Sequence, residues 1–236
     1  MLSAPLVFLF DVDNTLLDND RFNAELSGWL DQAFGQVERE RYWAIYATQR
    51  EQNGYADYLG ALQQFRFGSV AQVQLQETAD FLLEYPFERL LYPQALAAVA
   101  HLAAMAPVVI VSDGDMVFQP HKIRRSGIAA AFVERVLIYV HKQDSLDDLQ
   151  ARFRADHYVM IDDKPKLLAA MKQVLGARLT TVFVRQGHYA NDASAAPVDP
   201  PPDRTIDRIG DLLGLSLADF PPAPAHAPNN TAPETP

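Results

Sequence analysis

The amino-acid sequence predicts an α/β fold, with a doubly wound parallel sheet as its core and an α-helical subdomain inserted after the first strand. Short apolar runs recur along the chain and end abruptly in polar residues, which is typical of strands buried on both faces of a parallel sheet. Amphipathic segments of helical period separate these runs, as in successive βαβ units. A chain of 236 residues can form one such domain with a smaller subdomain.

The first predicted strand is the run 6–10, which ends directly at Asp11. Four later runs are also predicted as strands: 108–111 before Ser112, 136–140 leading to Lys142, 158–161 before Asp162, and 181–184 before Arg185. Helices are predicted between them at roughly 93–104, 116–126, 145–154 and 165–175. Because ligands gather at the carboxyl ends of parallel strands, these polar residues are candidates for a functional site.

The pattern changes after the first strand to long amphipathic stretches that are rich in aromatic residues. We therefore predict a core of residues 1–18 and 87–218, a helical cap of residues 19–86, and a disordered Pro/Ala-rich tail of residues 219–236. The aromatic residues of the cap are expected to pack inside it. As an alternative, Tyr42, Tyr46 or Tyr55 contacts substrate as part of a mobile lid.

The composition excludes several classes of function. Cysteine is absent, which excludes disulfides, thiolate catalysis and cysteine-ligated metals. A formal net charge of −10 argues against binding to a nucleic-acid backbone, which requires clustered Lys and Arg. No apolar stretch approaches the ~20 residues of a membrane span, and the first apolar run is too short for a signal peptide. We therefore expect a cytoplasmic protein that does not bind membranes.

The most informative segment is Asp11-Val12-Asp13-Asn14-Thr15, which follows the first predicted strand. Two carboxylates two residues apart on an extended segment can address the same ligand in different roles. One can attack while the other moves a proton. The alternative is a polar strand end followed by a turn or a helix cap.

Polar residues after three later strands would meet this segment at one edge of the sheet, and they favour the chemical explanation. They are Ser112, Lys142 and the pair Asp162–Asp163. A carboxylate that attacks a phosphate needs a divalent cation between the two negative groups, and Mg²⁺ prefers oxygen ligands. The expected ligands are the Asp11 carboxylate, the Asp13 main-chain carbonyl, one acid of the later pair, phosphate and water.

Phosphate oxygens would accept hydrogen bonds from the Ser112 hydroxyl and from the backbone amides of Asp113 and Gly114, while Lys142 supplies a cation. Ser112 as a plain helix cap is the alternative for that residue. A solvated surface lysine is the alternative for Lys142, with a lysine at position 164 or 166 in its place. The loop residues His188 and Tyr189 are left outside the catalytic set.

Together these residues resemble the four motifs of the haloacid dehalogenase superfamily, over roughly residues 6–190. The motif residues are, in order, Asp11/Asp13, Ser112, Lys142 and Asp162/Asp163. The segment Ser112-Asp113-Gly114-Asp115, with Gln119, Lys122 and Gly127, further resembles the second-motif helix of phosphoglycolate phosphatases and nucleotidases. The resemblance implies a Rossmann-like core with a cap between the first and second motifs.

The resemblance also implies roles for individual residues. It makes Asp11 the nucleophile, Asp13 the general acid/base, and Ser112 and Lys142 the groups that stabilise the phosphate and the intermediate. Asp163 is the preferred metal ligand, and Asp162 assists directly or through water. Thr15 would orient the first loop with Asn14 as its neighbour, both beside the substrate.

Dehalogenases of the superfamily need no second aspartate in the first motif, so Asp13 favours phosphate chemistry. We therefore predict a Mg²⁺-dependent phosphatase that hydrolyses a small phosphorylated metabolite through a phosphoaspartate on Asp11. The alternatives are a phosphomutase or phosphotransferase with the same intermediate, and a non-catalytic phosphate-binding module. The identity of the substrate and the oligomeric state stay open.

Overall fold

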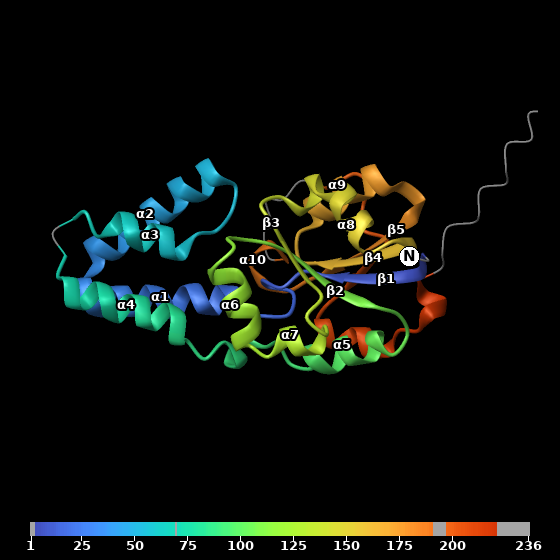
Figure 1. The fold of residues 1–236 in the computed structure, drawn as a ribbon, viewed down its shortest axis with the longest axis horizontal. Coiled ribbons are helices and arrows are strands. Elements are labelled where there is room, and N and C mark those ends of the chain that lie inside the picture. Colours follow the sequence, from blue (N-terminus) through green and yellow to red (C-terminus); the bar gives the residue numbers. More distant parts are fainter. Residues whose placement is uncertain (1–2, 69, 191–196, 221–236) are drawn as a thin grey trace, which may run out of the picture.

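The fold was analysed in a computed structural model, which describes residues 3–68, 70–190 and 197–220 of the chain. A six-stranded sheet forms the centre, in the order β3-β2-β1-β4-β5-β6, and all paired strands are parallel (Figure 1). The strands are β1 Ala4–Phe10, β2 Val108–Asp113, β3 Val136–Tyr139, β4 Ala155–Asp162, β5 Leu179–Val184 and β6 Arg204–Ile206. The predicted α/β fold is confirmed. β6 was not predicted because its three residues include no apolar run.

Alternate side chains of β1 enter two separate hydrophobic cores, as expected for a strand buried on both faces. Phe8 and Phe10 face one core together with residues of α5 (Ala95–Ala103) and α7 (Ile128–Ala131). Val7 and Leu9 face the other core, with residues of α8 (Leu146–Arg152) and α9 (Pro165–Leu175). Figure 1 shows these two pairs of helices on opposite faces of the sheet, so the sheet is doubly wound.

The core helices follow the predicted segments with shorter ends. The segment predicted as one helix at 116–126 forms α6 (Phe118–Arg125), and Gly127 with φ of +80° separates it from α7. The helix α9 has the predicted bounds, because Pro165 favours its first turn and Gly176 follows its last residue. A one-turn helix, α10 (Gly187–Ala190), follows β5.

Four helices between β1 and β2 form a unit of their own, which we call the helical insertion. They are α1 (Asn19–Phe34), α2 (Gln36–Asn53), α3 (Tyr58–Phe65) and α4 (Gln72–Glu84), and they occupy the segment predicted as a cap. Figure 1 shows them to the left of the sheet, with α6 between the two parts. Phe22 of α1 packs against Tyr58 at 5.3 Å and against Phe118 of α6 at 5.9 Å between ring centroids.

The chain enters and leaves the helical insertion at one place. The Asp18 amide donates a hydrogen bond to the Leu90 carbonyl at 2.8 Å, and the Tyr92 amide donates to the Leu16 carbonyl at 3.0 Å. Leu17 and Leu91 form an antiparallel bridge between these two bonds. The two connections therefore run side by side as a short paired linker.

The boundary of the predicted tail differs from the structure. Phe220 is buried and packs edge-on against Phe8 of β1, with 5.2 Å between ring centroids. Asp219 accepts a hydrogen bond from Arg204 of β6 at 3.0 Å. These two residues belong to the core, since an aromatic ring that covers β1 offsets its ordering entropy. The rest of the predicted tail, 221–236, lies outside the described residues. No helix in the described ranges is long and apolar enough to cross a membrane.

Candidate active site

Asp11 lies at the carboxyl end of β1 and is buried. Its Oδ1 accepts a hydrogen bond from Lys142 Nζ at 2.5 Å, and its Oδ2 accepts one from Thr15 Oγ1 at 3.1 Å. Burial alone would raise the pKa of Asp11, but the charges of Lys142 and Lys164 outweigh it and lower this pKa below its ordinary value. Asp11 is therefore held as a carboxylate that can act as a nucleophile.

Lys142 is fully buried in a single turn after β3. Its Nζ also lies 2.6 Å from Asp162 Oδ2, and its backbone amide donates to Asp113 Oδ1 at 2.8 Å. Burial would lower the pKa of Lys142, yet its acidic neighbours raise it above the ordinary value. The structure thus brings Lys142 into the site, although Lys164 also acts on Asp11 through its charge. The other alternative, Lys166, is exposed on α9.

Three buried carboxylates, those of Asp11, Asp162 and Asp163, each offer a ligand atom within 4.8 Å of the others. Both carboxyl oxygens of Asp163 are buried and accept no hydrogen bond in the described part of the chain. Burial and the neighbouring Asp162 and Asp11 raise the pKa of Asp163 to about 9. Burial and Asp11 likewise raise the pKa of Asp162 to about 6, although Lys142 opposes this rise. A divalent cation that prefers oxygen ligands fits this set of donors.

Asp13 lies in the loop after β1, within reach of α6. Its Oδ1 accepts a hydrogen bond from Lys122 Nζ at 2.5 Å, and its Oδ2 accepts one from Gln119 Nε2 at 3.1 Å. The same amide nitrogen lies 2.8 Å from Ser112 Oγ, so Gln119 joins Asp13 to Ser112. Lys122 is buried and also donates to Asn19 Oδ1 of α1 at 3.3 Å.

The contacts of Gln119 and Lys122 with Asp13 were not predicted from the sequence. The two residues were named there only for their resemblance to the second-motif helix of phosphoglycolate phosphatases and nucleotidases. Their spacing of three residues places both on one face of α6, and this was the available signal. The spacing alone does not show that this face of α6 contacts the loop after β1. That contact depends on how α6 packs against the sheet.

Two residues predicted to contact substrate have other partners in this structure. Asn14 Oδ1 accepts hydrogen bonds from the backbone amides of Asn19 and Asp20 at 3.0 and 3.1 Å, so Asn14 holds the first turn of α1. The Gly114 amide donates to the Tyr139 carbonyl at 3.0 Å. These groups fix the loops around the site.

A cavity of about 150 Å³ lies between the core and the helical insertion. The core side includes Asp13, Asn14, Asp113, Asp163, Lys164, His188 and Tyr189, and the side formed by the helical insertion includes Asn19, Asn23, Tyr46, Arg50, Gly54, Tyr55 and Ala56. Of the three tyrosines considered for substrate contact, two line this cavity. Tyr42 does not, because it is fully buried and donates to the Tyr58 carbonyl at 3.0 Å.

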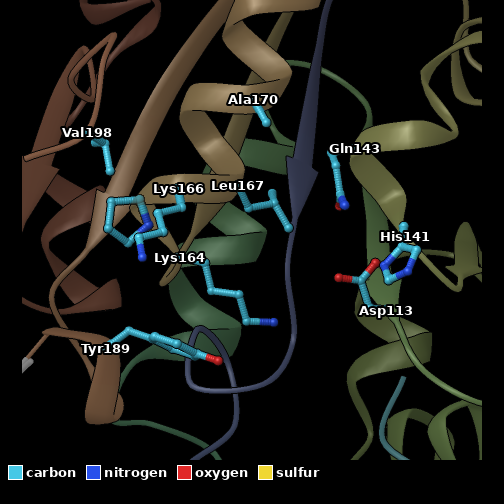
Figure 2. Close-up of a pocket in the computed structure, with 10 residues that line it drawn as sticks. Asp113, His141, Gln143, Lys164, Lys166, Leu167, Ala170, Tyr189 and Val198 are labelled. Carbon is cyan, nitrogen blue, oxygen red and sulfur yellow. The ribbon is translucent and has the colours of Figure 1, made fainter. Parts of the chain in front are cut away.

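A larger cavity, of about 410 Å³, opens beside the start of α9 (Figure 2). It shares Asp113, Lys164 and Tyr189 with the smaller one, and Figure 2 shows Lys164 and Tyr189 across from Asp113 and His141. Neither Asp11 nor Asp13 lines it. Asp11 does not line the smaller cavity either, but Asp13 and Asp163 do, so the smaller cavity is the one that reaches the candidate site.

Comparisons with known proteins agree with this geometry. A family model for haloacid dehalogenase-like hydrolases matches residues 6–175. A crystal structure named as a haloacid dehalogenase-like hydrolase, from Burkholderia xenovorans LB400, is 52% identical to this chain and has a TM-score of 0.85. The match covers 90% of this chain and 99% of that one. No curated protein matches the chain.

Two more distant solved structures share the fold. The HAD-hydrolase YfnB of Bacillus subtilis, bound to magnesium, is 18% identical with a TM-score of 0.61, covering 90% of this chain and 100% of that one. The L-2-haloacid dehalogenase of Xanthobacter autotrophicus is 16% identical with a TM-score of 0.56, covering 89% and 97%. The same fold thus carries more than one chemistry, and the residues of the site have to decide between them.

Proposed function

The chain belongs to the haloacid dehalogenase-like hydrolases, and from this premise we propose that it is a Mg²⁺-dependent phosphatase. Its substrate would be a small phosphorylated metabolite, hydrolysed through a phosphoaspartate on Asp11. The observation that carries the proposal is the second carboxylate, Asp13, which Gln119 joins to Ser112 in the same site. Departure of an alcohol from phosphorus needs a proton donor, and Asp13 is available for that role.

The chain's own residues account for the proposed steps. An oxygen of Asp11 attacks phosphorus in line with the departing alcohol, while Lys142 and the Ser112 hydroxyl bind the phosphoryl oxygens. Asp13 gives its proton to the alcohol oxygen as the P–O bond breaks. Asp13 then takes a proton from the water that attacks the phosphoaspartate, which releases inorganic phosphate and restores Asp11.

The metal would be held by the carboxylates of Asp11 and Asp163, with Asp162 beside them and the main-chain carbonyl of Asp13. When bound, Mg²⁺ supplies positive charge against the negative charge of the nucleophile and the phosphate. The unpartnered buried oxygens of Asp163 support this assignment. The helical insertion covers the site with Tyr46 and Tyr55, which limits the access of bulk water.

The test is phosphate release by the full chain from p-nitrophenyl phosphate and from a panel of phosphorylated metabolites, with Mg²⁺ and with EDTA. We expect Asp11→Asn to reduce the rate by at least about 10³-fold, since the nucleophile is lost. Asp147→Asn, an exposed aspartate of α8, is the matched control and should behave as the wild type.

The other outcomes identify the alternatives. Halide release from L-2-chloropropanoate without phosphate release would replace the proposal with a dehalogenase. Transfer of the phosphoryl group to an added alcohol faster than to water would indicate a phosphotransferase or phosphomutase. Binding of phosphate without turnover of any ester would indicate a non-catalytic module.

A further inference from the structure

Arg50, in the last turn of α2, lines the cavity of about 150 Å³ from the side of the helical insertion. We propose that Arg50 forms an anion subsite, so that the substrate is a small phosphate monoester with a second anionic group, either a carboxylate or another phosphate. The inference rests on the proposed function for the position of the reacting phosphoryl group. It adds the chemical class of the remainder of the substrate.

Arg50 differs from the other arginines of the helical insertion. Three of them pair with carboxylates: Arg21 with Glu25, Arg39 with Asp31 and Arg41 with Glu38. Arg66 is exposed at the carboxyl-terminal end of α3 and does not line this cavity. Arg50 is exposed and lines the cavity, and none of the ion pairs among the described residues includes it.

The guanidinium of Arg50 has one weak polar partner, the Tyr189 hydroxyl, to which it donates at 3.4 Å. An anionic ligand in the cavity would supply the charged partner that this guanidinium lacks among the described residues. The planar guanidinium also matches carboxylate and phosphate oxygens with two parallel hydrogen bonds. Arg50 therefore has both the charge and the free donors of an anion-binding group.

Two further side chains with a basic nitrogen line the cavity from the core side. Lys164 acts on Asp11, whose pKa it lowers. His188 lies 2.7 Å from Asp20. The acidic groups of the cavity, Asp13, Asp113 and Asp163, all come from the core. A second anion on the substrate would thus be repelled by the core side and attracted to Arg50.

Arg50 and Asp163, a candidate metal ligand, line the same small cavity. A cavity of about 150 Å³ holds roughly one benzene-sized molecule, which corresponds to a phosphoryl group and a few further atoms. The end of α2 is docked on the core, because a Cβ atom at Gly54 would lie 2.4 Å from His141 Nε2. This close approach fixes the last turn of α2 over the site.

The binding test uses non-hydrolysable ligands of equal length with the full chain and Mg²⁺, measured by calorimetry. They are 4-phosphonobutanoate, propane-1,3-diphosphonate and butylphosphonate, which lacks the second anion. We expect the wild type to bind at least one of the first two about tenfold more tightly than butylphosphonate. The tighter of the two identifies the second anion as a carboxylate or a phosphate.

The variants then assign the preference to Arg50. Arg50→Met should remove the preference for ligands with a second anion and leave the affinity for butylphosphonate within about twofold of the wild type. Arg50→Lys should retain part of the preference because the charge remains. Arg66→Met is the matched control and should bind as the wild type. Absence of the preference in the wild type, or its persistence in Arg50→Met, would overturn the subsite.

Turnover separates this inference from the proposed function. With 3-phosphonooxypropanoate and propyl phosphate as substrates, Arg50→Met should raise KM only for the first, by about tenfold. Hydrolysis of both esters with the same KM in wild type and variant would overturn the subsite alone. Selective binding of 4-phosphonobutanoate without hydrolysis of any ester would overturn the phosphatase and support the subsite.

Discussion

The two sides of the small cavity are built in different ways. The core side carries the carboxylates of Asp13, Asp113 and Asp163. Ion pairs lie directly behind this surface, between Asp11 and Lys142 and between Asp13 and Lys122. The side of the helical insertion consists of aromatic rings with polar ends and one arginine without a carboxylate partner among the described residues. The difference indicates that the sheet fixes the reacting groups, whereas the helical insertion shapes what surrounds them. Changes on the two sides should therefore affect different measured quantities.

The strongest test on the core side is Asp13→Asn, which keeps the shape of the side chain and removes a carboxyl group that could exchange a proton with substrate. We expect kcat for an alkyl phosphate to fall by about 10²–10⁴-fold, the usual contribution of general acid catalysis. The loss should be smaller for p-nitrophenyl phosphate, because nitrophenolate departs without protonation. Steady-state kinetics on both substrates checks this. Equal losses on both would mean that Asp13 does not protonate the leaving group.

Lys122→Met tests a residue that contacts both sides. It should lower kcat by about 10- to 100-fold, because Asp13 loses the ammonium group that holds its Oδ1 at 2.5 Å. KM should change less, since Lys122 is not among the residues that line the cavity. The exposed Lys166→Met is the control. A change in KM alone would indicate that Lys122 acts in substrate binding and not through Asp13.

Metal and pH test the carboxylates of the core side through stability. The pKa values of Asp163 and Asp162 in the fold, about 9 and about 6, are raised above their ordinary value of 3.8. Below pH 3.8 both groups contribute favourably to the free energy of unfolding. This contribution is lost as the pH rises through their pKa values in the folded state. Asp11 acts in the opposite sense, because its pKa is lowered. In EDTA, the raised pKa values of Asp162 and Asp163 should therefore make Tm fall as the pH increases from about 4 to about 9.

Mg²⁺ should raise Tm more at pH 9 than at pH 5, because the ligands must be deprotonated to bind it. Thermal unfolding at the two pH values, with and without Mg²⁺, measures this difference. Asp163→Asn should abolish most of the Mg²⁺-dependent increase. An increase that is equal at both pH values would argue against a metal site at these carboxylates.

The smallest expected effect lies inside the helical insertion. Tyr42→Phe removes the buried hydroxyl that donates to the Tyr58 carbonyl at 3.0 Å, and it should reduce the free energy of unfolding by about 1 kcal/mol. Both kcat and KM should stay unchanged, because Tyr42 does not line the cavity. Denaturant unfolding and kinetics check this, with the exposed Thr48→Val as a control. A change in kcat would show that packing of the helical insertion does affect the chemistry.

The same comparison explains what could be predicted from the sequence. The polar groups at the ends of β1, β2 and β4 were predicted because each follows a short apolar run, and parallel strands bring such ends to one edge. Asp11 and Asp162 lie in one cluster of carboxylates, and Ser112 is joined to Asp13 through Gln119. The fold class followed from the same runs.

The residues supplied by helices could not be predicted in the same way. Arg50 and Asn23 lie on helices whose exposed faces all carry polar residues, and only the docking of the helical insertion decides which of them meets the core. Lys122 lies among other basic residues of α6, and its burial follows from the position of Asp13 in a different segment. Sequence periodicity gives the face of a helix but not its partner.

The paired linker at Leu16–Asp18 and Leu90–Tyr92 has a consequence for how this protein can be re-engineered. Because both connections leave the sheet at one place and hydrogen-bond to each other, the ends of the helical insertion are already adjacent. Any folded segment whose own termini lie close together could be spliced there without altering the order of the strands. The helical insertion can therefore be exchanged for another folded segment at one place in the chain, while the sheet stays the same.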